Sequence, residues 1–111
     1  MSNIKIFRAN RGEGKTKWLA ERIKECAEAG ECLLYVGQEW TFSNVKRVYE
    51  ATYKEVCPVE MADAFRCFTP YDTFFTDELI DNVTSVAKYK SYIIDNGCDW
   101  YITMSQEDFV D

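Results

Sequence analysis

The chain of 111 residues contains no histidine, only two prolines and only five glycines. Without histidine, no imidazole is available as a general base or as a zinc ligand. The five cysteines, at positions 26, 32, 57, 67 and 98, include no pair with the CxxC spacing of zinc sites. No apolar run approaches the roughly 18 residues that a transmembrane helix needs. These absences exclude histidine chemistry and argue against a structural zinc site and a membrane span.

The N-terminal sequence MSNIKIFRAN lacks the apolar segment of a signal peptide. We therefore expect a cytoplasmic protein that has no membrane partner. A hydrophobic fraction of 47% is enough to bury a core, and the length predicts a single domain that spans residues 1–111.

The net charge of −6 is distributed unevenly along the chain. Residues 1–24 hold seven basic and two acidic residues, a balance of +5, whereas residues 95–111 hold five acidic residues and no basic one. The first segment is therefore a candidate anion site. The overall acidity makes binding to nucleic acid by this chain alone unfavourable. The acidic and aromatic C-terminal segment is a candidate surface for a protein partner.

Apolar periodicity predicts strands that alternate with helices. We expect strands at 4–9, 32–37, 64–69 and 91–95, and helices at 14–30, 41–56 and 77–89. Gly30 should follow the end of the first helix, and Thr76 should cap the third; segment 100–111 fits either a strand or a helix. The alternation predicts a three-layer α/β/α fold around a small, mainly parallel sheet of about four strands. In such sheets the site lies at the carboxyl ends of the strands.

A glycine-containing segment joins the first predicted strand to the first predicted helix, and residues 9–16 read ANRGEGKT. Gly12 and Gly14 permit positive φ angles, so that consecutive backbone N–H groups can surround an anion. Lys15 can reach the β- and γ-phosphates of a nucleotide, and the hydroxyl of Thr16 can bind Mg²⁺. The segment resembles the Walker A motif GxxxxGK[ST] of P-loop NTPases, with alanine in the first position. The structural alternative is a flexible turn before a helix.

The resemblance implies that the chain binds ATP, or another nucleoside triphosphate, together with Mg²⁺. It also implies that Lys15 and Arg11 stabilise phosphate charge during a reaction. The contacts to the nucleotide would come from Asn10, Arg11, Gly12, Glu13, Gly14, Lys15, Thr16 and Lys17.

The segment YIIDN, at 92–96, resembles a Walker B strand, whose terminal carboxylate holds Mg²⁺. On this resemblance Asp95 joins Thr16 as a metal residue; the structural alternative is a turn that closes the strand. Helicase-like P-loop proteins have a glutamate after this aspartate, and it orients the attacking water. Because Asn96 stands there and cannot accept a proton, we expect hydrolysis to be weak or to depend on a partner.

A substitute carboxylate is then needed for catalysis. Glu39 is the best candidate, because it follows the second predicted strand, where RecA-like proteins place their catalytic glutamate. Asp72 and Asp99 are further candidates, and each of the three can equally be a helix cap or a solvated loop residue.

Three functions stay open at this stage. The first is a minimal RecA- or helicase-like protein that binds ATP and Mg²⁺. The second is a nucleoside or nucleotide kinase, since the chain resembles the thymidine-kinase branch in size and strand order. The third is a non-enzymatic interaction protein or inhibitor on a P-loop scaffold, a type common among phage-encoded proteins. The aromatic residues Trp18, Trp40, Trp100 and Tyr101 are candidates for stacking on a nucleobase, with core packing as the alternative.

Overall fold

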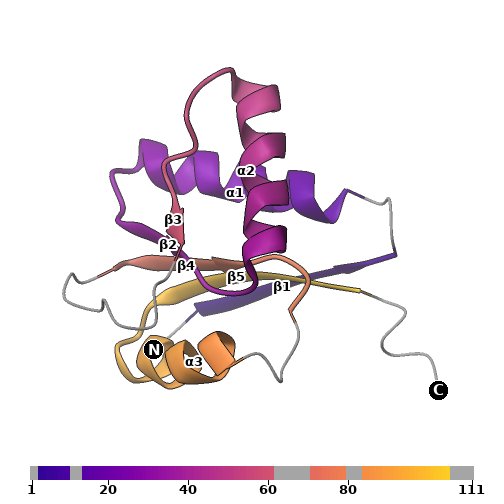
Figure 1. Cartoon of the computed structure of the whole chain (residues 1–111). Helices are drawn as coiled ribbons and strands as arrows, with labels where there is room; N and C mark the ends of the chain where they lie inside the picture. The colour runs from indigo at the N-terminus through magenta and orange to yellow at the C-terminus, as the bar shows by residue number, and fades with distance from the viewer. Residues whose placement is uncertain (1–2, 11–13, 62–70, 80–83, 106–111) are drawn as a thin grey trace.

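A parallel β-sheet with helices on both faces forms the architecture of the computed structural model (Figure 1). The structure describes residues 3–10, 14–61, 71–79 and 84–105. In these ranges the elements are, in chain order, β1 (Asn3–Ala9), α1 (Lys15–Glu28), β2 (Leu33–Tyr35), α2 (Glu39–Tyr53), β3 (Glu60–Met61), β4 (Thr73–Thr76), α3 (Thr84–Asp95) and β5 (Asp99–Ser105). None of these helices is long and apolar enough to cross a membrane.

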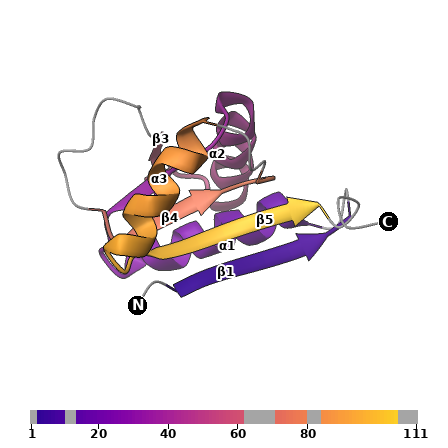
Figure 2. The same ribbon diagram turned by 90° about the horizontal axis from the view of Figure 1, so that it is seen from below.

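The strands lie in the order β1-β5-β4-β2-β3, and each neighbouring pair is parallel. Helices α1 and α2 cover one face of the sheet and α3 covers the other, as Figures 1 and 2 show. The predicted α/β/α fold is thus confirmed, with five strands in the described ranges where about four were expected. Because the strands are parallel, the loops that follow β1, β2 and β4 all leave the same edge of the sheet.

Alternating side chains of the central strands supply two apolar cores. Leu33 and Tyr35 of β2 pack with Phe75 of β4 beneath α1 and α2. Leu34 and Phe74, from the same two strands, pack on the other face with side chains of α3. Strands β2 and β4 are therefore buried on both sides, as is typical of the middle of a parallel sheet.

The first four elements follow the sequence prediction. Their ends differ from the predicted bounds by at most three residues. Gly30 follows α1 with φ +78°, and the next residue, Glu31, donates its backbone N–H to the carbonyl of Cys26 at 3.2 Å. This 6→1 hydrogen bond is typical of a helix that ends on a left-handed glycine. The role predicted for Gly30 is confirmed.

The strand predicted at 91–95 is wrong, because these residues form the last part of α3. Tyr89 and Ile93, one helical turn apart, are both buried against the sheet. Ile94, the residue after Ile93, is 46% exposed. Gly97, with φ +65°, ends the helix in the same way as Gly30 ends α1, because Cys98 donates its N–H to the Ile93 carbonyl at 3.0 Å. A face of period 3.6 outweighs the β-propensity of this apolar run.

Strand β4 was not predicted. Its four residues, Thr73–Thr76, are all buried, but the threonines at both ends and the preceding TPYD made the segment resemble a turn. Thr76 belongs to this strand and does not cap a helix, and residues 77–79 are not helical. Segment 100–105 is strand β5, whereas the strand predicted at 64–69 lies outside the described residues.

Candidate functional site

The carboxyl edge of the sheet brings together the ends of β1 and β4 and the starts of α1 and α2 (Figure 2). Strand β5 lies between β1 and β4, and its Thr103 pairs with Phe7 of β1. Residues that are far apart in the sequence therefore meet above β5. The candidate site is built from this edge.

Gly14 marks the start of α1. Its φ of +84° and ψ of +23° are left-handed, a conformation that only glycine adopts without strain. Its carbonyl accepts the N–H of Trp18 at 2.9 Å, so that the helical hydrogen bonds begin here. The N–H groups of the first turn have no partner within the helix and carry the positive end of the helix dipole, an arrangement that favours an anion.

Thr16, in this first turn, is directly joined to the end of β4. Its hydroxyl donates a hydrogen bond of 2.9 Å to Oδ2 of Asp77, the residue that follows the strand. The other carboxylate oxygen, Oδ1, accepts the hydroxyl of Thr103 from β5 at 2.5 Å. One carboxylate is thus held between the helix start and the neighbouring strand.

Asp77 is only 2% exposed. Burial raises the pKa of its carboxyl, because the charged form loses hydration, while the hydrogen bonds from Thr103 and Thr16 act in the opposite direction. Within the described ranges no ion pair joins this carboxylate to a basic side chain, although the charge of Lys15 also acts to lower its pKa. The carboxylate is therefore suited to receive a cation.

The next residue, Glu78, has an unusual backbone conformation. Its φ is +53°, and such a left-handed non-glycine residue costs on the order of 1–3 kcal/mol. Its N–H is held by Oγ1 of Thr103 at 2.8 Å. The side chain reaches the amino group of Lys15, with 3.4 Å between Nζ and Oε1. Lys15 itself is 6% exposed, so the ion pair fixes a buried amine beside the helix start.

A chain of hydrogen bonds links the backbone of Asp77 to the start of α2. The Asp77 N–H is donated to the phenol oxygen of Tyr35 at 3.0 Å, and this oxygen lies 2.5 Å from the hydroxyl of Thr41. The Thr41 hydroxyl in turn donates to the carbonyl of Gln38 at 2.8 Å. Because the Thr41 hydroxyl donates to Gln38, the Tyr35 hydroxyl donates to the Thr41 oxygen, and it also lies 3.4 Å from the carbonyl of Asp77. Burial keeps the phenol protonated by raising its pKa far above the usual range.

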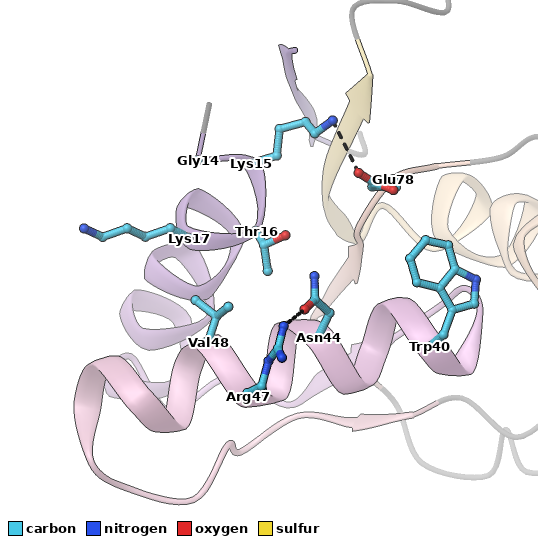
Figure 3. A pocket seen from close by; sticks show the side chains of 9 residues that line it. All are labelled: Gly14, Lys15, Thr16, Lys17, Trp40, Asn44, Arg47, Val48 and Glu78. Atoms are coloured by element: carbon cyan, nitrogen blue, oxygen red, sulfur yellow. Dashed lines mark hydrogen bonds and ion pairs between the residues drawn. The ribbon is translucent and has the colours of Figure 1, made fainter. Parts of the chain in front are cut away.

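A pocket of about 450 Å³ opens between the first turn of α1, one face of α2 and Glu78 (Figure 3). This volume falls within the range of small-molecule sites. Among the described residues, three basic side chains, those of Lys15, Lys17 and Arg47, line it together with one carboxylate, that of Glu78. The pocket thus has an excess of positive charge although the chain is acidic overall.

The other residues predicted for the nucleotide site are only partly described. Asn10 follows β1 and is exposed, whereas Arg11, Gly12 and Glu13 lie outside the described residues. Glu39 is the first residue of α2, at the correct edge of the sheet, and its side chain is exposed. It does not line the pocket of Figure 3, whose acidic residue is Glu78.

The position predicted for Asp95 is wrong. Asp95 is the last residue of α3, and the chain then turns into the start of β5 at Asp99. The start of a parallel strand lies at the amino edge of the sheet, opposite the glycine loop. Asp72 and Asp99 lie at this amino edge as well, since Asp72 precedes β4 and accepts the N–H of Cys32 at 2.8 Å. None of the three carboxylates is at the edge that holds Thr16.

Sequence reasoning missed Asp77, Glu78 and Thr103. The signal for the first two was present in the segment TFFTDE, two phenylalanines between threonines followed by an adjacent aspartate and glutamate. The role of Thr103 had no local signal, because only the position of β5 between β1 and β4 places its hydroxyl beside Asp77.

Comparison of the chain with models of protein families, with curated proteins and with solved structures gives no match.

Of the candidate aromatic residues, three pack within the fold. Trp18 stacks on Phe7 with 5.1 Å between ring centroids, Tyr101 stacks on Phe75 with 5.5 Å, and Trp100 is 2% exposed. Trp100 therefore does not contribute to a C-terminal surface, and residues 106–111 lie outside the described ranges. Trp40 is 58% exposed and lines the pocket.

Proposed function

We propose that the chain binds a nucleoside triphosphate with Mg²⁺ in the pocket between α1 and α2, and that it hydrolyses the terminal phosphate. The observation that carries the proposal is the hydrogen bond between Thr16 and Asp77. It joins the residue after the glycine–lysine pair to a carboxylate at the end of a buried strand, which is the relationship that the Walker A and Walker B motifs have in P-loop NTPases.

The phosphates would lie at the start of α1. The first-turn N–H groups and the ammonium of Lys15 supply positive charge at one point. In the structure Lys15 is paired with Glu78 at 3.4 Å, a distance too long for a strong hydrogen bond. A phosphate oxygen, which carries more charge and lies within reach of the helix start, would compete for the same ammonium. Binding would then release the Glu78 carboxylate.

The donor set at Thr16 and Asp77 fits magnesium. Mg²⁺ prefers oxygen ligands and is usually held by one or two carboxylates together with water and substrate phosphates. The hydroxyl of Thr16 and the carboxylate of Asp77 are both oxygen donors, and they already lie 2.9 Å apart. In the described ranges no cluster of three or more His, Cys, Asp or Glu residues forms a complete metal cage, and a phosphate-bound Mg²⁺ does not require one. When bound, the ion would neutralise charge on the phosphate oxygens.

Glu78 is the residue that we assign to the attacking water. Its left-handed backbone directs the side chain into the pocket beside Lys15, immediately after the metal-binding carboxylate. Once Lys15 binds phosphate, a Glu78 oxygen can accept a proton from a water molecule as the water oxygen bonds to the γ-phosphorus and the bridging oxygen leaves with the diphosphate. Asn96 follows the end of a helix, so its inability to accept a proton has no bearing on this step.

Nucleotide titration followed by thermal unfolding tests the proposal. ATP–Mg²⁺ at about 100 times its Kd should stabilise the chain by ~2.7 kcal/mol. For a domain of this size the melting temperature should then rise by roughly 10 °C. Lys15→Ala should abolish the shift. Lys46→Ala, which removes an exposed lysine of α2 outside the pocket, should leave the shift unchanged.

The absence of any shift at millimolar nucleotide would overturn the proposal. It would also remove the nucleoside-kinase hypothesis, which needs the same phosphate site, and would leave the interaction-protein hypothesis. Phosphate transfer to a nucleoside in place of water would identify a kinase that uses the same residues.

A further inference from the structure

Trp40 is a large exposed aromatic residue at the mouth of the pocket. It is the second residue of α2, and 58% of its surface is exposed. The indole N–H donates to the side-chain oxygen of Gln38, so that the polar edge of the ring is satisfied within the protein. The apolar face of the indole is therefore accessible to a flat aromatic ligand.

Two polar side chains extend this surface along α2. Asn44 and Arg47 follow Trp40 by one and two helical turns, and the guanidinium of Arg47 donates to Oδ1 of Asn44 at 2.5 Å. A hollow of about 370 Å³ is lined by these three residues and Ser43. The same three residues also line the phosphate pocket (Figure 3), so the two spaces adjoin along α2.

The composition of this surface matches a nucleobase. A base presents an aromatic face for stacking and a polar edge for amide and guanidinium groups. From Trp40 to Arg47 the helix rises by roughly 10 Å, at 1.5 Å per residue. The phosphate end of the pocket is basic, through Lys15 and Lys17, and the Trp40 end is aromatic.

We propose that Trp40, Asn44 and Arg47 form a nucleobase subsite, in which the base stacks on the indole of Trp40 and its edge bonds to the Asn44 amide. The inference rests on the proposed nucleotide-binding function and names the group beyond the phosphates that the pocket takes. The base can belong to the bound triphosphate or to a separate nucleoside, since both present the same chemistry to α2.

Three probes separate the phosphate site from the base subsite: tripolyphosphate, ATP and adenosine, each titrated with Mg²⁺ by calorimetry. They are applied to wild type, Trp40→Leu and Trp40→Phe. Val56→Ala is the control, since Val56 is 80% exposed and lies outside the pocket. If the stacked base is that of the triphosphate itself, wild type should bind ATP about tenfold or more tightly than tripolyphosphate. Trp40→Leu should bring the two affinities close together without weakening tripolyphosphate binding, and Trp40→Phe should restore part of the difference.

Adenosine identifies the source of the base. If adenosine displaces ATP, the triphosphate's own base occupies Trp40. If Trp40→Leu weakens adenosine but not ATP, a separate nucleoside occupies it, and the subsite is supported in either case. Binding of tripolyphosphate together with equal affinities of wild type and Trp40→Leu for ATP and adenosine would overturn the subsite while the proposed function stands. If tripolyphosphate and ATP both fail to bind, the subsite and the proposed function fail together.

Discussion

The hydroxyl of Thr16 and the carboxylate of Asp77 are joined by a hydrogen bond of 2.9 Å, although 61 positions separate the two residues in the sequence. The contact connects the first turn of α1 with the end of a strand that lies two places away from β1 in the sheet. Each of the following predictions concerns a residue that makes or supports this connection, or one that lies beside it.

Gly14 and Gly30 offer a matched pair for testing the glycine loop. Both have a left-handed φ, +84° and +78°, and a Cβ atom added at either would meet no atom of the described residues within 4 Å apart from its chain neighbours. Alanine should therefore cost each position a similar amount, about 1 kcal/mol in urea unfolding. Only Gly14→Ala should weaken binding of ATP–Mg²⁺, because Gly14 sets the first N–H groups of α1. Equal affinities for the two variants would argue against a phosphate site there.

Asp77→Asn should raise the stability of the ligand-free protein. Burial raises the carboxyl pKa of Asp77 above its unfolded value of about 3.9. The stability that depends on this carboxyl is therefore fully present below about pH 3.9, where the group is protonated, and it is lost as the pH rises through the folded pKa and the buried group becomes charged. Asparagine keeps two hydrogen-bonding groups without the charge.

Urea unfolding of wild type and Asp77→Asn between pH 4 and pH 7 measures this effect. The free energy of unfolding of the variant should increase relative to that of wild type as the pH rises, and by pH 7 the variant should be more stable by roughly 1 kcal/mol. A wild type that is the more stable protein at pH 7 would show that the buried carboxylate is not a cost to folding.

Tyr35→Phe should affect both stability and ligand binding. It leaves the buried N–H of Asp77 without its acceptor and removes one of the two hydrogen bonds of the Thr41 hydroxyl, at a cost of about 1–3 kcal/mol. Because Asp77 then loses its backbone anchor, affinity for ATP–Mg²⁺ should also fall. Tyr49→Phe is the control, since it removes a hydrogen bond to Glu55 beyond the end of α2. Tyr49→Phe should bind ATP–Mg²⁺ with the affinity of wild type. If Tyr35→Phe also binds it with the affinity of wild type, the anchoring role of Tyr35 is disproved.

Glu78→Gln should separate binding from hydrolysis. Glutamine cannot accept a proton, so phosphate release in a single turnover should slow by about 100-fold or more. Affinity for ATP should stay equal or rise, because Lys15 loses its competing carboxylate. Glu39→Gln, at the start of α2, should keep the wild-type rate. If Glu39→Gln is the variant that stops turnover, the assignment of Glu78 is wrong.

The sequence predicted the strand and helix on either side of the glycine-containing segment well because its signals are local. A strand, a glycine-containing loop and an amphipathic helix follow one another within about 25 residues, and the positions of Gly14, Lys15 and Thr16 depend only on that order. Gly30 was assigned correctly for the same reason, as it follows a helical apolar pattern directly.

The carboxylate that contacts Thr16 was not predicted because its position depends on long-range packing. The run YIID has the composition of a strand, and only its burial against the sheet shows a helical face through Tyr89 and Ile93. Gly97 gave the same helix-end signal as Gly30, but the apolar run before it was interpreted as a strand. The segment TFFT is short and has threonine at both ends, so its local signal for a strand is weak, and its central place in the sheet follows only from the packing of the whole fold.

The measurement that tests the account most directly is calorimetric titration of ATP, with and without Mg²⁺, into wild type, Asp77→Asn and Asp95→Asn. Both variants remove one carboxylate, but Asp77 lies at the glycine loop and Asp95 at the opposite edge of the sheet. The account predicts that Mg²⁺ strengthens binding to wild type and Asp95→Asn alike, and that Asp77→Asn loses this gain, by roughly tenfold or more in Kd. A Mg²⁺ gain that survives in Asp77→Asn and disappears in Asp95→Asn would contradict it.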